Sequence, residues 1–97
     1  MNVRYNLLKK KNTSYILLCI SYDGKRLQTS INEKIDANKW SKLKQRVKIS
    51  CTEAFNINSY LDKIEATAKK IYYKCKMEGY SPTTDGLKEM MFSKLNG

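Results

Sequence analysis

The sequence predicts an α+β fold in which a three-stranded antiparallel sheet packs on one long C-terminal helix, with a short helix or turn around Trp40 and a final short helix. Strand-like segments joined by an Asp-Gly dipeptide indicate the sheet. An apolar stripe at alternating spacings of three and four residues indicates the helix. With 97 residues, the chain has room for one modest core.

The first strand is expected over residues 2–8, where polar and apolar side chains alternate. Residues 9–13, which read KKKNT, are expected to form a loop. The segment 14–22 is apolar on both faces, as a central strand would be. A type I′ turn needs positive φ at both central residues, which Asp23-Gly24 tolerates, so a third strand is expected over residues 25–31.

This turn predicts the pairing register of the second and third strands. Tyr22 opposes Lys25 next to the turn, and the pairs then follow one by one until Ile16 opposes Ile31. One face of the hairpin becomes apolar and belongs to the core: Ile16, Leu18, Ile20, Leu27 and Ile31. The first strand joins this face with Val3, Tyr5 and Leu7.

The opposite face of the sheet is expected to be exposed and to carry side chains that can read bases. Arg forms paired hydrogen bonds with guanine, Asn and Gln do so with adenine, and a β-ribbon fits the major groove. The candidate base-reading residues are Arg4, Asn6, Arg26, Gln28 and Ser30, with Tyr15, Leu17 and Cys19 behind them. Polar residues also face outward on most surface strands, so an ordinary solvated face stays an alternative.

Residues 32–50 are rich in lysine. Asp36 is expected to begin one helical turn as its N-cap, and Trp40 to anchor this turn in the core. The basic side chains near the sheet could hold phosphates or form a solvated rim. The candidate phosphate contacts are Lys9, Lys10, Lys11, Lys25, Lys44, Arg46 and Lys48.

A long helix is expected to begin at Thr52 or Asn56 and to reach Glu78, with Gly79 as the residue that ends it. Its stripe could form a coiled-coil seam, but covering the sheet is favoured because the apolar face has no other cover. The stripe consists of Ala54, Ile57, Leu61, Ile64, Ala68, Ile71 and Cys75. A final helix, capped by Thr83 or Thr84, carries Leu87, Met90, Met91 and Leu95.

The charge of the chain indicates a polyanionic partner. Nineteen Lys and Arg against nine Asp and Glu give a net charge of +10. Residues 1–50 hold twelve basic and three acidic side chains, a net charge of +9, whereas residues 51–97 hold seven and six. The binding face is therefore expected in the N-terminal half.

The sequence also excludes several classes of function. Histidine is absent, which removes the commonest general base and the commonest zinc ligand, so neither catalysis nor a cofactor or metal is expected. Cys19, Cys51 and Cys75 form no C-x-x-C motif; Cys19 and Cys75 are expected to be buried, in a reducing cytoplasm. The longest apolar run, 15–20, is too short to span a bilayer, so no membrane partner is expected.

The order of these elements resembles the N-terminal arm-type DNA-binding domain of tyrosine recombinases, in the version found in Bacteroides-type phage and conjugative-transposon integrases. Residues 22–26, YDGKR, are similar to the family's Y-x-G-K-R hairpin. Further matches are Ser30-Ile31-Asn32, Ile35-Asp36, Lys39-Trp40 and Arg46-Val47-Lys48. Departures are Ile31 in place of Thr, Asn32 in place of Gly and Ala37 in place of Pro.

The resemblance covers residues 2–80 and implies an arm-type DNA-binding domain over 1–80, with 81–97 as a linker and first helix toward a missing core-binding domain. It implies sequence-specific binding of double-stranded DNA in integration and recombination, with other integrase protomers as partners of the full-length parent. The expected place is the bacterial cytoplasm, at the nucleoid. The chain itself is expected to bind without cutting. RNA binding and a helix-mediated protein interaction remain alternatives.

Overall fold

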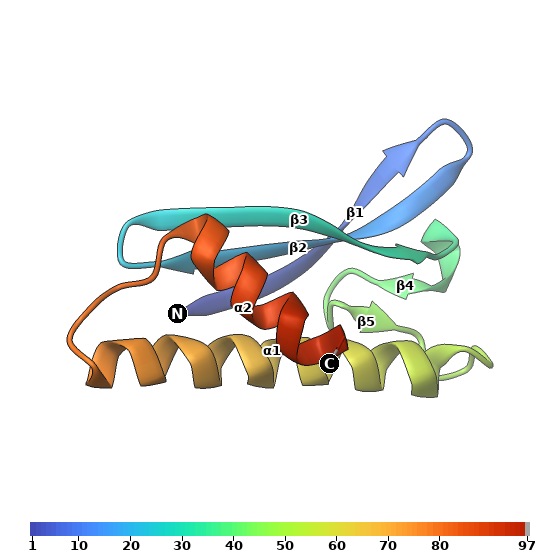
Figure 1. Ribbon diagram of the computed structural model, residues 1–97. Coiled ribbons are helices and arrows are strands. Elements are labelled where there is room, and N and C mark those ends of the chain that lie inside the picture. The colour runs from blue at the N-terminus through green and yellow to red at the C-terminus, as the bar shows by residue number, and fades with distance from the viewer. Residues whose placement is uncertain (97) are drawn as a thin grey trace.

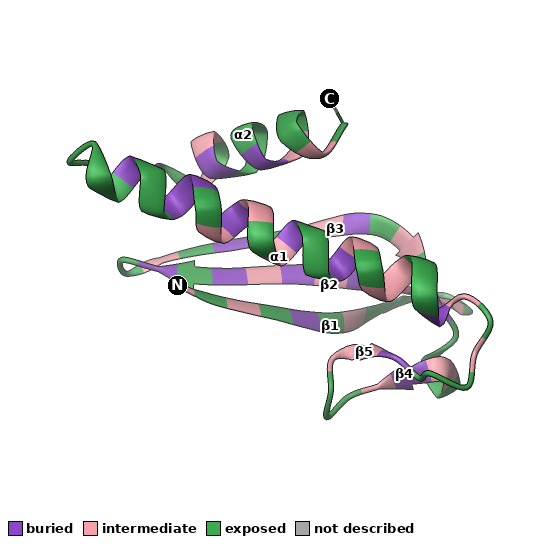
Figure 2. Cartoon of the chain, turned by 90° about the horizontal axis from the view of Figure 1, so that it is seen from below, coloured by how far each residue is buried: buried purple, intermediate pink, exposed green. Residues whose placement is uncertain are grey.

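The structure, a computed structural model, describes residues 1–96 and confirms the predicted α+β class (Figure 1). Its elements are β1 (Asn2–Lys10), β2 (Thr13–Tyr22), β3 (Lys25–Lys34), a 3₁₀ turn η1 (Ala37–Lys39), β4 (Trp40–Ser41), β5 (Arg46–Val47), α1 (Ala54–Met77) and α2 (Thr84–Asn96). β1, β2 and β3 form one antiparallel sheet in that order. α1 crosses one face of this sheet, the inner face, and α2 lies beside α1 (Figures 1 and 2).

The register predicted from the Asp23-Gly24 turn is confirmed over six pairs. Both turn residues have positive φ, as a type I′ turn requires. The pairing runs without a shift from the pair next to the turn to Leu17, which lies opposite Ser30. Side chains from the two strands therefore share faces as the sequence predicts.

The seventh predicted pair, Ile16 opposite Ile31, is wrong. Tyr15 pairs with Lys34, so between the last confirmed pair, Leu17 and Ser30, and this one β2 moves by two residues while β3 moves by four. Asn32 lies inside this bulge with a φ of 62°, a left-handed conformation that asparagine tolerates. The bulge lets β3 continue to Lys34, three residues beyond its expected end.

The loop expected at residues 9–13 is also wrong. Lys9 and Lys10 belong to β1 and pair with the start of β2, which leaves a two-residue turn at 11–12. Lys11 lies in this turn with a φ of 54°. The composition of residues 9–13 is typical of a loop, but the pairing between β1 and β2 extends the strands into this stretch. The β1–β2 hairpin therefore extends beyond the body of the domain (Figure 1).

The core lies between the inner face and α1. Leu61, Ile64 and Ala68 of α1 are 0% exposed, as are Ile16 and other inward residues of β2. Buried positions recur along the length of α1 between exposed ones (Figure 2). The predicted stripe is confirmed, with Ile57 half-buried. Tyr72 is buried as well, although it lies outside the predicted stripe.

Tyr5 connects β1 to two other elements. Its hydroxyl donates a 2.6 Å hydrogen bond to the carbonyl of Leu61, and its backbone N–H donates to Oε1 of Gln45 at 3.0 Å. The guanidinium of Arg46 lies 5.1 Å from the centre of its ring. Burial raises the pKa of the Tyr5 hydroxyl, which therefore stays protonated and keeps its donor role.

A small β4–β5 hairpin that the sequence did not predict follows η1. Asp36 lies at the N-cap of η1 as expected, but its side chain makes no capping hydrogen bond. Trp40 is 7% exposed, which confirms it as an anchor. The side chain of Asn58, on α1, accepts from the N–H of Val47 at 2.8 Å and donates to its carbonyl at 2.9 Å. This pair of bonds fixes the hairpin on α1.

α1 ends as the sequence predicts. Gly79 has a φ of 91°, and its N–H donates to the carbonyl of Lys76 at 3.0 Å. The N–H of Tyr80 donates to the carbonyl of Cys75, also at 3.0 Å. This is the Schellman arrangement, in which glycine takes the left-handed position without the cost of a Cβ.

α2 shares the core of the sheet and α1. Of the two predicted caps, Thr83 is the one that caps α2, because its Oγ1 accepts a hydrogen bond from the N–H of Gly86 at 3.0 Å. Leu87 and Met91 are 0% exposed and belong to the same apolar cluster as α1 and the sheet. Residue 97, at the end of the expected segment 81–97, lies outside the described residues.

Asp23 joins the β2–β3 turn to the end of α1. Its carboxylate accepts hydrogen bonds from Ser81 at 2.7 Å, from Tyr72 at 2.8 Å and from the ammonium of Lys76 at 3.3 Å. These hydrogen bonds, of which the one from Ser81 has the largest effect, lower the pKa of Asp23 from 3.8 to about 2. The residue that forms the turn therefore also ties the turn to the helical layer.

Ile64→Asp is expected to abolish cooperative folding, because it places an unpaired charge at a fully buried position. Thermal unfolding followed by circular dichroism measures this. The matched control is Lys63→Asp at the neighbouring exposed position, which should shift stability by no more than about 0.5 kcal/mol. Retention of the wild-type melting temperature by Ile64→Asp would contradict the packing of α1 on the sheet.

Asp23→Asn is expected to lower the melting temperature at pH 7 while keeping the turn, since Asn-Gly also suits type I′ geometry. The lowered pKa means that the charged carboxylate stabilises the fold fully above about pH 4 and loses this effect as the pH falls toward 2. The difference in melting temperature between the two proteins should therefore shrink between pH 4 and pH 2. A difference that does not change with pH would contradict the role of the charge.

Candidate nucleic-acid interface

The face of the sheet opposite α1, called the outer face from here on, carries the predicted binding residues. Within residues 1–96, no helix or loop covers it (Figure 1). The strand register arranges its side chains in rows across β1, β2 and β3. In this strand order, the rows are Asn2, Ser21, Arg26; Arg4, Cys19, Gln28; Asn6, Leu17, Ser30; and Leu8, Tyr15, Lys34.

The five candidate base-reading residues all lie on the outer face. Arg4, Asn6, Arg26 and Gln28 are exposed. Ser30 is half-buried, and its Oγ accepts a hydrogen bond from the backbone N–H of Asn32 at 3.2 Å. Three adjacent rows therefore combine guanidinium, amide and hydroxyl groups, the groups that pair with base edges in the major groove.

The expectation that Cys19 is buried is wrong. Cys19 lies in the second row of the outer face and is half-buried. Its Sγ accepts a hydrogen bond from Nδ2 of Asn6 at 3.7 Å. The apolar run that contains Cys19 forms a strand, and alternation along a strand places every second residue of such a run outside the core. Cys75, in contrast, is buried as expected.

Basic side chains gather at the extended β1–β2 hairpin. Lys9, Lys10 and Lys11 are exposed there. The ammonium groups of Lys10 and Lys34 lie 6.0 Å and 5.8 Å from the ring centre of Tyr15. Lys34 is not among the residues predicted to bind, because only the bulge in β3 brings it into the row of Tyr15.

Two candidate phosphate contacts are engaged inside the domain. Nζ of Lys25 donates to Oγ of Ser81 at 2.7 Å, on the α1 side of the sheet. The guanidinium of Arg46 bonds Oδ1 of Asp62 through Nη2 at 2.8 Å and lies 3.9 Å from Glu65. Both side chains therefore contact the helical layer instead of pointing from the outer face.

The last two candidates, Lys44 and Lys48, are exposed beside β4 and β5. This hairpin lies at the β1 edge of the sheet (Figure 2), on the side of α1 (Figure 1). The N–H of Gln45, next to Lys44, donates to the carbonyl of Ser41 and closes the turn between the two strands. Lys44 and Lys48 thus form a basic flank that is separate from the outer face.

The acidic side chains of the domain lie away from the outer face. Several of them form ion pairs on the helical side, for example Glu53 with Lys39 at 3.3 Å. None of the five ion pairs found among residues 1–96 includes Arg4, Arg26, Lys10 or Lys34. The outward positions of the three strands, all within this described part, carry no carboxylate. The outer face is therefore a cationic surface whose charges stay available to an anion.

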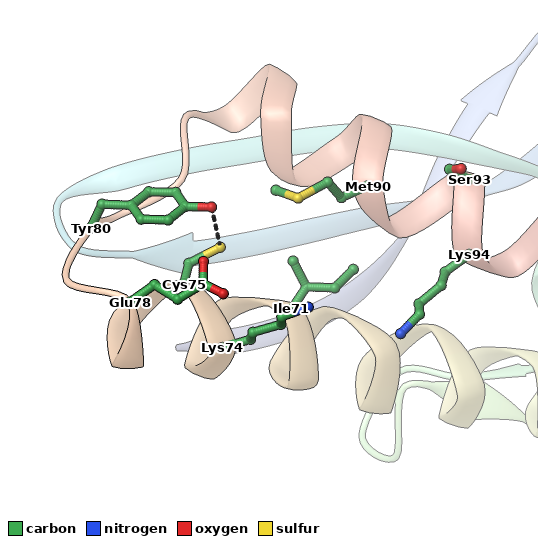
Figure 3. A pocket seen from close by; sticks show the side chains of 8 residues that line it. All are labelled: Ile71, Lys74, Cys75, Glu78, Tyr80, Met90, Ser93 and Lys94. Carbon is green, nitrogen blue, oxygen red and sulfur yellow. Dashed lines mark hydrogen bonds between the residues drawn. The ribbon is translucent and has the colours of Figure 1, made fainter.

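A pocket of about 620 Å³ lies elsewhere, between α1 and α2 (Figure 3). Ile71 and Met90 contribute its apolar lining, and the thiol of Cys75 donates to the Tyr80 hydroxyl at 3.3 Å. Across residues 1–96, no three His, Cys, Asp or Glu side chains are placed to hold a metal ion. No helix in the same range is long and apolar enough to cross a membrane.

The part of the chain that forms the sheet and α1 is also the part that is similar to a known family. A family model described as an arm DNA-binding domain matches residues 2–88, which include the whole sheet, the β4–β5 hairpin and α1. No match was found among curated proteins or solved structures. The matched range covers most of the chain, and the fold has the exposed cationic sheet described above. The chain belongs to the arm DNA-binding domain family.

Proposed function

We propose that this domain binds duplex DNA sequence-specifically, with its outer face in the major groove. The supporting observation is the set of exposed, unpaired side chains in adjacent rows, above all Arg4, Arg26 and Gln28. Neighbouring strands lie about 4.8 Å apart, so three strands are about 10 Å wide. The major groove is about 12 Å wide and accepts such a ribbon.

Contacts to base edges and to phosphates come from different parts of the surface. The rows of Arg4 and Arg26 reach bases near the middle of the sheet. Lys9, Lys10 and Lys11 extend past the body of the domain on the hairpin and reach phosphates. Lys44 and Lys48 flank the β1 edge and are placed for a second set of phosphates, whereas Lys25 and Arg46 serve the fold.

The domain would act as the arm-binding module of a tyrosine recombinase used in DNA integration and recombination. Family membership supports this role. In such a parent, cutting and joining belong to other domains, other integrase protomers bind alongside, and the protein works at the bacterial nucleoid. Segment 81–97 would lead toward the next domain.

Binding is expected to depend strongly on salt. If about six cationic side chains meet phosphates, log K should fall with log salt with a slope of about −5. Fluorescence anisotropy with a labelled duplex between 50 and 300 mM salt (about a sixfold range) measures the slope. A slope near zero would contradict binding to nucleic acid.

Arg26→Ala and Lys10→Ala are expected to weaken binding in different ways. On a duplex that the wild-type protein has selected from a random library, Arg26→Ala should cost about 1–3 kcal/mol, and much less on random duplex. Lys10→Ala should weaken both duplexes alike and reduce the salt slope by about one. Anisotropy titrations on both duplexes measure this.

Lys70→Ala, on the exposed side of α1, is the matched control and should behave as wild type. Equal losses on both duplexes for Arg26→Ala would mean that the outer face contacts only the DNA backbone. Equal affinity for an RNA duplex of the selected sequence would favour shape recognition of nucleic acid and contradict major-groove reading.

A further inference from the structure

The middle strand of the outer face differs chemically from its two neighbours. The outward residues of β1 and β3 in the first three rows are polar or charged. Along β2, however, the outward positions include Tyr15, Leu17 and Cys19, and each of them is half-buried. Apolar surface thus runs along the centre of the outer face, between polar edges in the rows of Cys19 and Leu17, whereas in the row of Tyr15 it continues onto Leu8 of β1.

Among the apolar residues along β2, Leu17 gives the clearest indication of a contact with a binding partner. Its neighbours across the sheet are Asn6 on β1 and Ser30 on β3, both polar. Within residues 1–96 no other element lies over this face (Figure 1). The apolar side chain of Leu17 therefore lies on a face that is open to water. The strand would form equally well with a β-branched polar residue such as threonine at this position.

The major groove offers one apolar group that such a side chain can meet. The edges of guanine, cytosine and adenine present donors and acceptors there, whereas thymine adds its 5-methyl group. In a three-stranded ribbon laid into the groove, the middle strand is centred over the bases and the outer strands lie nearer the walls. Leu17, on the middle strand β2, would therefore lie over the base edges.

We infer that Leu17 is a specificity-determining residue that packs against the methyl group of a thymine, so that the recognised duplex has an A·T pair beneath the middle of β2. This inference rests on the proposed function. It adds an apolar component to recognition, between the polar contacts from Asn6 and Ser30 on either side.

The test is a double-substitution cycle on the selected duplex. Each thymine is replaced singly by deoxyuridine, which removes only the methyl group, and binding of wild type and Leu17→Ala is measured by anisotropy. For at least one position, wild type should lose about fourfold in affinity, the value of one buried methyl group. Leu17→Ala should bind the unmodified duplex more weakly and lose nothing further at that position.

Three variants make the test specific. Leu43→Ala removes the same atoms from a side chain that is 93% exposed in the β4–β5 turn, and it should keep the wild-type response to deoxyuridine. Arg26→Ala should bind more weakly but keep that response, because its contact lies in another row. Leu17→Thr, which suits a strand, replaces Leu17→Ala if circular dichroism shows that the alanine variant is not folded.

If no thymine shows a loss that the Leu17 variant removes, the inference is wrong while sequence-specific binding stands. If the random library yields no enriched duplex, the proposed function fails and the inference fails with it. A deoxyuridine response that persists in the Leu17 variant assigns the methyl contact to another side chain and also overturns the inference.

Discussion

The packing of one helical stripe on one face of the sheet is the constraint on which the structure depends. Leu18 and Ile20 on the sheet and Leu61 and Ile64 on α1 are fully buried, and burial of a side chain of this size contributes about 1.5–3 kcal/mol. A strand that buries alternate residues must turn the others away. The same packing that stabilises the domain therefore creates an uncovered second face and arranges its side chains in rows.

Two groups of polar contacts hold the sheet on the helical side. From the middle of β1, Tyr5 reaches α1 and the β4–β5 hairpin. At the β2–β3 turn, Asp23 accepts bonds from Tyr72 and Ser81. Six of the nine acidic side chains lie in residues 51–97, which include both helices. The excess of positive charge therefore lies in residues 1–50, on the sheet and the β4–β5 hairpin, and the net charge of +10 is unevenly distributed over the surface.

The sequence predicted features that depend on local periodicity, and missed those that depend on distant partners. Alternation and the Asp-Gly turn were enough to place Arg26 and Gln28 on the same face. The bulge that moves Lys34 into its row contains Asn32, whose residue type tolerates a left-handed backbone, but the sequence alone does not show that the pairing shifts there. Lys25 and Arg46 find partners 56 and 16 residues away, and no spacing rule reveals such partners.

The bulge around Asn32 has a consequence for the shape of the domain. An extra stretch in one strand increases the right-handed coiling of the ribbon at that point. The rows near Tyr15 are thus rotated with respect to the rows near Arg26, and the surface is a helicoid, not a plane. A duplex is itself helical, so a rigid flat sheet would touch its groove over a short arc only. A coiled sheet can follow the groove for longer without bending the DNA.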